Sequence, residues 1–260
     1  MEPVCPSIGW GVLHLFFEVD RASTDSEHGA KRIVDAVASL ERADHQALTF
    51  AVLGHKAEFG VMALGPDLAR LHAFQQELRG APIRLVDSYV SLTELSEYTS
   101  SEDDERARLR TEEGLSGDAL EAQLVVWRER MEHYQEHRLH PRLPSKAVIG
   151  FYPMSKRRVG PDNWYSLPFE ERKRLMGGHA RVGRRYAGRI LQLITGSTGL
   201  DDWEWGVTLL ADDVVALKDI VMEMRFDEVS ARYADFGPFI TGLVLPVTDA
   251  LARVGLDPSR

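Results

Sequence analysis

One order of secondary structure is expected twice along the 260-residue chain, and it limits the fold more than any other feature. The order is strand, helix, strand, strand, helix, strand, where β-branched and aromatic runs alternate with segments of helical period. This is the pattern of a ferredoxin-like unit, an antiparallel sheet with helices on one face. In the first copy these elements are expected at residues 10–20, 26–44, 47–54, 58–65, 66–81 and 83–95.

The second copy begins at residue 146. Its elements are expected at residues 146–156, 166–190, 191–197, 203–212, 213–237 and 238–246. Ser166 is the expected N-cap of its first helix. Each sheet has a second face to bury, so the two units should pack on each other or on a neighbouring subunit. The expected fold class is therefore α+β, two tandem ferredoxin-like units of the dimeric α+β-barrel type with a helical insertion.

The insertion occupies residues 100–145, between an N-terminal unit (1–99) and a C-terminal unit (146–260). Its first part is highly charged, and we expect it to be mobile. Its second part has a helical pattern that ends before Pro141. Such a length is unusual for a connector, and the sequence is equally compatible with a functional role and with a solvated connector.

Charge and cysteine content limit the partners and the compartment. The net charge of −9 argues against non-specific binding to nucleic acid or to an anionic membrane. No apolar run approaches the roughly 20 residues that span a bilayer. The first ten residues lack the layout of a secretory signal, and the single Cys5 cannot form an internal disulfide. We therefore expect a cytoplasmic protein.

The stretch FYPMSKRR, residues 151–158, places Tyr152 where an apolar strand changes into a cluster of cations. From the pattern alone, Tyr152 is most simply a core aromatic residue. A second candidate is His179, which shares one helical face with Leu175, Val182 and Tyr186 and so points inward. Such a histidine is usually a core residue. Its helix, however, also contains several glycines that favour the close approach of another helix or of a planar ligand: Gly177, Gly178, Gly183 and Gly188.

Four longer stretches carry a family resemblance: FYPMSKRR, NWYSLPFEERKRLM, YAGRILQLITGSTGLDDWEWGVTL and MRFDEVSARYADFGPF. They resemble the coproheme decarboxylases, the hydrogen-peroxide-dependent haem synthases of the chlorite-dismutase-like superfamily. The match is dense over residues 138–240, and the N-terminal half matches only in its ferredoxin-like pattern.

The resemblance implies the last step of coproporphyrin-dependent haem biosynthesis. In that reaction two propionates of coproheme III become vinyl groups, with hydrogen peroxide as the oxidant and a tyrosyl radical on the way, giving haem b and CO2. Coproheme is then both substrate and redox centre, with no other metal. The family also implies a homopentamer, transient contact with a coproporphyrin ferrochelatase, and no nucleic-acid or membrane partner.

Three residues carry the implied chemistry. His179 matches the proximal ligand of the haem iron, Tyr152 the tyrosine that forms the radical, and Lys156 the lysine needed for decarboxylation. A ligating histidine usually donates its second N–H to a neighbouring acceptor, and Glu228 is a candidate for it.

Further residues match the substrate-binding positions of the family. Arg138, Arg225 and Ser230 match residues that hold propionates, beside Tyr152 and Lys156. The distal position that matches Gln192 is a glutamine in some family members. Three histidines stay open as an alternative distal base: His133, His137 and His140.

The sequence departs from the family pattern at Ala180 and Arg181, next to the proximal histidine, where a glycine and an apolar residue are expected. This affects the detail of the pocket and not the ligand position. Three other functions stay open: a chlorite dismutase, a haem-binding or haem-trafficking protein without activity, and a structural module without porphyrin. A chlorite dismutase would be expected to carry a distal arginine in place of Gln192.

Overall fold

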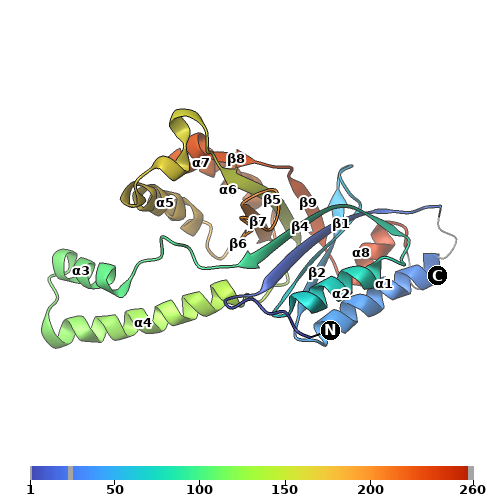
Figure 1. Cartoon of the computed structure of the whole chain (residues 1–260), viewed down its shortest axis with the longest axis horizontal. Coiled ribbons are helices and arrows are strands. Elements are labelled where there is room, and N and C mark those ends of the chain that lie inside the picture. Colours follow the sequence, from blue (N-terminus) through green and yellow to red (C-terminus); the bar gives the residue numbers. More distant parts are fainter. Residues whose placement is uncertain (1, 23–25, 257–260) are drawn as a thin grey trace.

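The computed structural model describes residues 2–22 and 26–256 and contains both copies of the expected pattern (Figure 1). The first copy consists of β1 (Gly11–Val19), α1 (Ser26–Glu41), β2 (Gln46–Leu53), β3 (Phe59–Gly65), α2 (Leu68–Leu78) and β4 (Ile83–Thr93). The second consists of β5 (Val148–Lys156), α5 (Phe169–Arg184), β6 (Ile190–Gly196), β7 (Trp205–Ala211), α6 (Val214–Met224), α7 (Glu228–Tyr233), β8 (Ala234–Phe236), β9 (Ile240–Val244) and α8 (Val247–Arg253).

The strands of both copies form one closed, antiparallel sheet. Its order is β7-β6-β4-β1-β3-β2-β9-β5, and a further pairing of β5 with β7 completes the ring, while β8 adds to β5 outside it. The two copies meet at two seams, β2 with β9 and the short pairing of β4 with β6. Closure leaves these eight strands without an open edge. The expected α+β fold class is confirmed, with the two sheets joined edge to edge.

Side chains alternate between the inside and the outside of the barrel, as the period of two in a strand requires. Val12 and Phe16 of β1 point inward and pack with Phe151 and Leu210 of the second copy, so the inner faces bury each other. The outer face of the first copy is covered by α1, α2 and α8. The outer face of the second copy packs against α6 and, at Tyr186, the end of the α5 segment.

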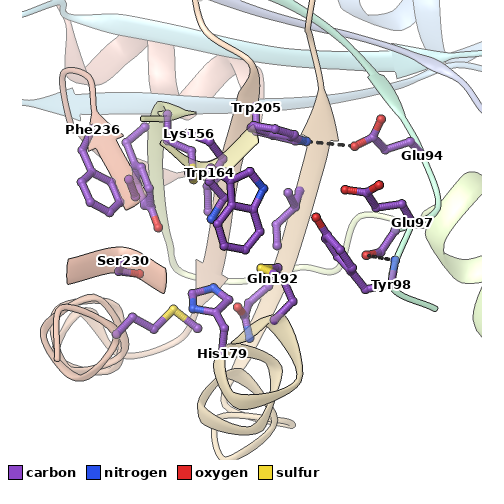
Figure 2. Close-up of a pocket in the computed structure, with 18 of the residues that line it drawn as sticks. Glu94, Glu97, Tyr98, Lys156, Trp164, His179, Gln192, Trp205, Ser230 and Phe236 are labelled. Atoms are coloured by element: carbon purple, nitrogen blue, oxygen red, sulfur yellow. Dashed lines mark hydrogen bonds between the residues drawn. The ribbon is translucent and has the colours of Figure 1, made fainter. Parts of the chain in front are cut away.

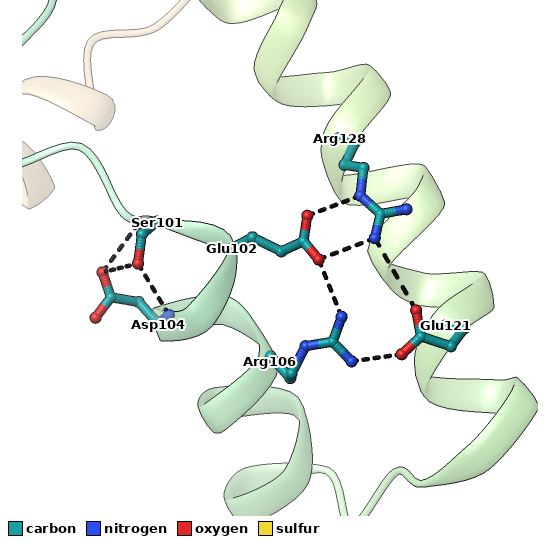
Figure 3. A network of polar contacts seen from close by, with 6 residues as sticks. All are labelled: Ser101, Glu102, Asp104, Arg106, Glu121 and Arg128. Atoms are coloured by element: carbon teal, nitrogen blue, oxygen red, sulfur yellow. Dashed lines mark hydrogen bonds and ion pairs between the residues drawn. The ribbon is translucent and has the colours of Figure 1, made fainter.

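The insertion is an ordered helical arm, which corrects the expectation that its first part is mobile. It consists of α3 (Glu102–Glu112) and α4 (Gly117–Leu139) and extends away from the barrel (Figure 1). Ser101 and Asp104 form a reciprocal capping box at the start of α3. The charges there are paired within and between the helices, since Glu102 binds Arg106 of its own helix at 3.0 Å and Arg128 of α4 at 2.8 Å (Figure 3). Three leucines fill the space between the helices: Leu109, Leu120 and Leu124.

Two expectations for the second copy were wrong in detail. Ser166 is not an N-cap, because it lies in the short 3-10 turn Trp164–Ser166 and Pro168 occupies the cap position before α5. The long helix expected at residues 213–237 is broken into α6, α7 and β8, because the Asp227 side chain caps a new helix by accepting from the Ser230 N–H. In the described part of the chain, no helix combines the length and apolar character needed to cross a membrane.

We expect Gly242, at the β2–β9 seam, to be essential for barrel closure. An added Cβ would lie 2.6 Å from a ring carbon of Phe50 and 2.9 Å from the carbonyl oxygen of Ala51. Gly242→Ala should lower the free energy of unfolding by about 1–3 kcal/mol in urea denaturation. As a control, Gly177→Ala on α5 meets no atom within 4 Å and should raise it by up to about 1 kcal/mol. Wild-type stability of Gly242→Ala would show that the seam can shift.

Candidate functional site

A cavity of about 410 Å³ lies between the outer face of β5, β6 and β7 and the helices α5, α6 and α7. Apolar side chains such as Ile194, Val207 and Leu209 form much of its wall. The segment after β4 closes one end of it (Figure 2). Elements far apart in the sequence bring all seven predicted site residues to this cavity: Arg138, Tyr152, Lys156, His179, Gln192, Arg225 and Ser230.

His179 comes from α5 and has one fixed nitrogen. Its Nδ1 lies 2.8 Å from Oδ2 of Asp227, which also accepts from the Ser230 N–H at 3.3 Å. Burial alone would raise the pKa of Asp227, but the contacts with His179 and the Ser230 N–H, together with the charge of Lys156, hold it below its usual range. An ionised Asp227 requires Nδ1 to be the donor, and in the neutral ring this leaves the lone pair of Nε2 for a metal ion. Glu228, the acceptor suggested by the sequence, instead pairs with Arg232 at 2.9 Å.

The glycines of α5 have different roles. A Cβ on Gly183 would lie 3.2 Å from the Gln192 amide and 3.3 Å from Met224, so this glycine allows a close approach. Gly177 and Gly178 have no neighbour within 4 Å of the same position, and Gly188 has a φ of 81° after the helix end. Among the described residues, the expected close approach is therefore present at Gly183, and the other three glycines have no such neighbour.

Tyr152 and Lys156 both face the cavity because they stand an even number of residues apart on β5. The Tyr152 ring stacks on Phe239 with centroids 4.5 Å apart. Burial raises the pKa of Tyr152 to about 12, opposed by the charge of Arg225, so the phenol keeps its proton at neutral pH.

Lys156 is a buried cation that lies over an aromatic ring. Its Nζ is 4.5 Å from the ring centre of Trp164, and only 9% of the residue is exposed. Burial lowers the pKa of Lys156 to about 8, while Asp227 and Glu204 oppose the shift. At neutral pH Lys156 is therefore an ammonium group that can be deprotonated at little free-energy cost.

The other cations border the cavity in different ways. Arg225, at the C-terminus of α6, places its guanidinium 4.1 Å from the ring centre of Phe236. Arg138, at the end of α4, donates from Nη2 to the carbonyl oxygens of Glu94 and Ile194, both at 3.4 Å. Its Nε is buried without a hydrogen-bond partner in the described part of the chain. A buried donor of this kind is expensive and suits a site that receives an anion.

Gln192 faces the cavity from β6, and its Nε2 donates to the Gly183 carbonyl oxygen at 3.2 Å. This contact joins the sheet to α5 one helical turn beyond His179. The three alternative histidines do not line the cavity. His133 and His137 are exposed and contact each other at 3.0 Å, and His140 lies 2.9 Å from Glu136.

Several residues of the cavity escaped the sequence reasoning. Trp164 and Trp205 line it, as do Glu94 and Tyr98 from the segment after β4. The tryptophans stand in the stretches that carried the resemblance and could have been found there. No sequence signal marks Glu94 or Tyr98, because they belong to the first unit and reach the cavity only after the barrel has closed.

The fold and the cavity define a dimeric α+β-barrel protein with a histidine-containing pocket on the outside of the second unit. The chain belongs to the chlorite dismutase family, since the profile of that family matches residues 27–245.

Two solved structures show the likeness. A novel haem-binding protein from Thermus thermophilus is 36% identical, with a TM-score of 0.77 and coverage of 98% of this chain and 100% of that chain. A mutant chlorite dismutase from Candidatus Nitrospira defluvii is 15% identical, with a TM-score of 0.69 and coverage of 96% of this chain and 97% of that chain, which shows the fold alone.

The buried ammonium of Lys156 should cost stability. Burial lowers the pKa of Lys156 in the folded state to about 8, whereas an ordinary lysine has a pKa near 10.4. Between these two pH values Lys156 is therefore protonated in the unfolded chain and neutral in the folded protein, so stability rises with pH there. Lys156→Met should therefore raise the free energy of unfolding by about 1–3 kcal/mol at pH 7, and the gain should shrink as the pH rises from 8 to 10. Urea denaturation at several pH values measures this.

The control for this experiment is Lys218→Met, whose wild-type side chain is 75% exposed. It should change stability little and without this pH dependence. A destabilised Lys156→Met protein at pH 7 would mean that the lysine contributes more by its contacts than it costs by its burial.

Proposed function

We propose that the protein is a coproheme decarboxylase, which uses hydrogen peroxide to convert two propionates of coproheme III into vinyl groups and so makes haem b. The observation that carries the proposal is the convergence of the seven candidate residues on one cavity. In a chain with a net charge of −9, this cavity has an apolar wall edged by Lys156, Arg138 and Arg225. An apolar slot with cations at its edge suits a flat ligand that carries several carboxylates.

The residues present fit an iron porphyrin. His179 would hold the iron through Nε2, while Asp227 fixes the tautomer and orients the ring. Arg138, Arg225, Ser230 and Lys156 would bind propionates. Gln192, whose Nε2 donates to the Gly183 carbonyl oxygen in this structure, would be the distal residue. Gln192 is neutral and would act by hydrogen bonding, without a change of charge.

Each decarboxylation consumes one propionate, one hydrogen peroxide and one proton, and yields one vinyl group, one CO2 and two water molecules. The bound iron porphyrin supplies the redox chemistry with peroxide. Tyr152 would lose the hydrogen atom of its O–H and then take one from the β-carbon of the propionate. The pKa of about 12 suits this role, because the phenol keeps its O–H until it is oxidised. Lys156, with a pKa of about 8, can hold the carboxylate as a cation and also give up a proton.

We also propose a homo-oligomer, with the pentamer of the resembling family as the expected form. Several apolar side chains of α4 are open to solvent, among them Val125, Val126 and Tyr134 at 48%, 57% and 41% exposure. A projecting helix of this kind is suited to pack against a second copy. Transient contact with a coproporphyrin ferrochelatase and a cytoplasmic location belong to the same proposal.

The test is the addition of ferric coproporphyrin III and then stoichiometric peroxide to the purified protein, followed by mass analysis of the porphyrin. The wild type should give haem b. Tyr152→Phe keeps the ring, and it should bind coproheme and consume peroxide but lose at least about 99% of decarboxylation, because a phenyl ring has no O–H to oxidise. Tyr186→Phe is the matched control, since Tyr186 is equally buried at 7% but bonds Glu223 outside the cavity.

The same assay separates the alternatives. Release of O2 from chlorite without conversion of coproheme would indicate a chlorite dismutase. Haem binding without either reaction would leave a haem-binding protein. Normal haem b formation by Tyr152→Phe would remove this residue from the mechanism.

His179→Ala should lose the histidine-ligated spectrum of the ferric complex, because the nitrogen that would reach the iron is removed. Electron paramagnetic resonance and absorption spectroscopy measure this directly, whereas affinity can persist through the propionate contacts. His137→Ala serves as the control, because His137 lies on α4 outside the cavity. If the spectrum changed in His137→Ala and stayed the same in His179→Ala, the assignment of His179 as the iron ligand would be wrong.

A further inference from the structure

One corner of the cavity contains a carboxyl that the proposed reaction does not use. Glu94 follows β4, and its Oε1 accepts a hydrogen bond from the indole N–H of Trp205 at 3.1 Å. Figure 2 shows this pair at the end of the cavity opposite to Phe236 and Ser230. Within residues 2–22 and 26–256, the second oxygen of Glu94 has no hydrogen-bond partner.

Arg138 borders the same corner without neutralising Glu94. Its guanidinium contacts the backbone carbonyl of Glu94, and it forms no ion pair with any residue that the structure describes. A half-buried carboxyl and a half-buried guanidinium thus line the same cavity, and within the described residues each keeps a polar atom without a hydrogen-bond partner. Since the Nε of Arg138 is fully buried and an unpaired buried donor is costly, the corner suits a ligand group that can contact both residues.

A glycine in the sheet leaves room for this carboxyl. Gly196 pairs with Leu92 where β4 meets β6, and a Cβ on Gly196 would lie 2.1 Å from Oε2 of Glu94. Only glycine therefore allows the observed position. Burial raises the pKa of Glu94, which the Trp205 hydrogen bond and the Arg138 charge oppose in part.

We propose that Glu94 is a specificity-determining residue that, in its protonated form, donates a hydrogen bond to a ligand carboxylate held by Arg138. The inference rests on the proposed function, in which that carboxylate is a propionate of coproheme. Two carboxylates in contact repel each other when both are ionised, which favours a shared proton between Glu94 and the ligand. Binding of the ligand then takes up one proton at Glu94, and affinity falls as the pH rises above the pKa of the free carboxyl.

The other charged groups around Glu94 are few in the described part of the chain. Arg138 approaches from α4, and Glu97 lies on the same segment with its side chain 57% exposed. The neighbours from β6 and β7, Gly196 and Trp205, carry no charge. Lys156 and His179 also face the cavity, but they are the same in wild type and in the Glu94 variants, so the ratio of two affinities isolates Glu94.

The experiment measures the dissociation constant of ferric coproporphyrin III by absorption at pH 5.5 and pH 8 for wild type, Glu94→Gln and Glu94→Met. Glutamine keeps a donor at both pH values, and methionine has none. Wild type and Glu94→Gln should agree within about threefold at pH 5.5, and wild type should bind at least about tenfold more weakly than Glu94→Gln at pH 8. Glu94→Met should bind about tenfold more weakly than wild type at pH 5.5.

Glu97→Gln is the matched control and should follow wild type at both pH values. Three results would overturn the inference: an equal ratio of wild type to Glu94→Gln at both pH values, the same shift in Glu97→Gln, or wild-type affinity in Glu94→Met. Failure of the wild type to bind ferric coproporphyrin at either pH would overturn the proposed function as well. The two failures are thus distinct.

Discussion

The pairing of β5 with β7 closes the sheet into a barrel, and the rest of the molecule depends on this closure. It gives each of the eight ring strands two neighbours and leaves the inner faces of both copies packed on each other. The outer face of the second copy is then free to build a cavity beneath α5, α6 and α7. The barrel interior supplies stability through apolar packing, and the outer face can contain polar groups that a core would not tolerate.

Those polar groups are partly removed from water in the cavity, and their shifted pKa values show which side chains are affected. Burial raises the pKa of Tyr152 and lowers that of Lys156, so both shifts favour the neutral form. Asp227 is the exception, because His179, the Ser230 N–H and Lys156 together keep it ionised against the effect of burial. This one anion therefore fixes the tautomer of His179 and also attracts Lys156. A bound ligand with several carboxylates would supply ion-pair partners for Arg138 and Arg225, which form no ion pair with the residues that the structure describes.

The sequence predicted the order of the elements well because each depends on local patterns: alternation in strands, a helical period, and turn residues between them. The local patterns did not show which strands join the two units into the expected barrel, since the four-residue seam of β2 with β9 has no local signal. Local chemistry also misled at two points. Ser166 has the side chain of an N-cap, but Pro168 occupies the cap position of α5. The apolar period continues across Asp227 without a break, but the side chain of Asp227 caps a new helix there. The order of the charged arm was missed because its ion pairs join residues from two helices, such as Glu102 and Arg128.

The candidate site likewise contains residues that the sequence predicted and residues that it did not. Tyr152, Lys156, His179, Gln192, Arg225 and Ser230 all lie in the second copy and were found through long contiguous stretches of sequence. Arg138 comes from the insertion, and Glu94 and Tyr98 come from the first copy, so one end of the cavity exists only where β4 meets β6. The first copy has an equivalent outer face, but α1, α2 and α8 fill it with apolar contacts. One copy therefore stabilises the barrel and the other holds the site, and the seam between them completes the pocket.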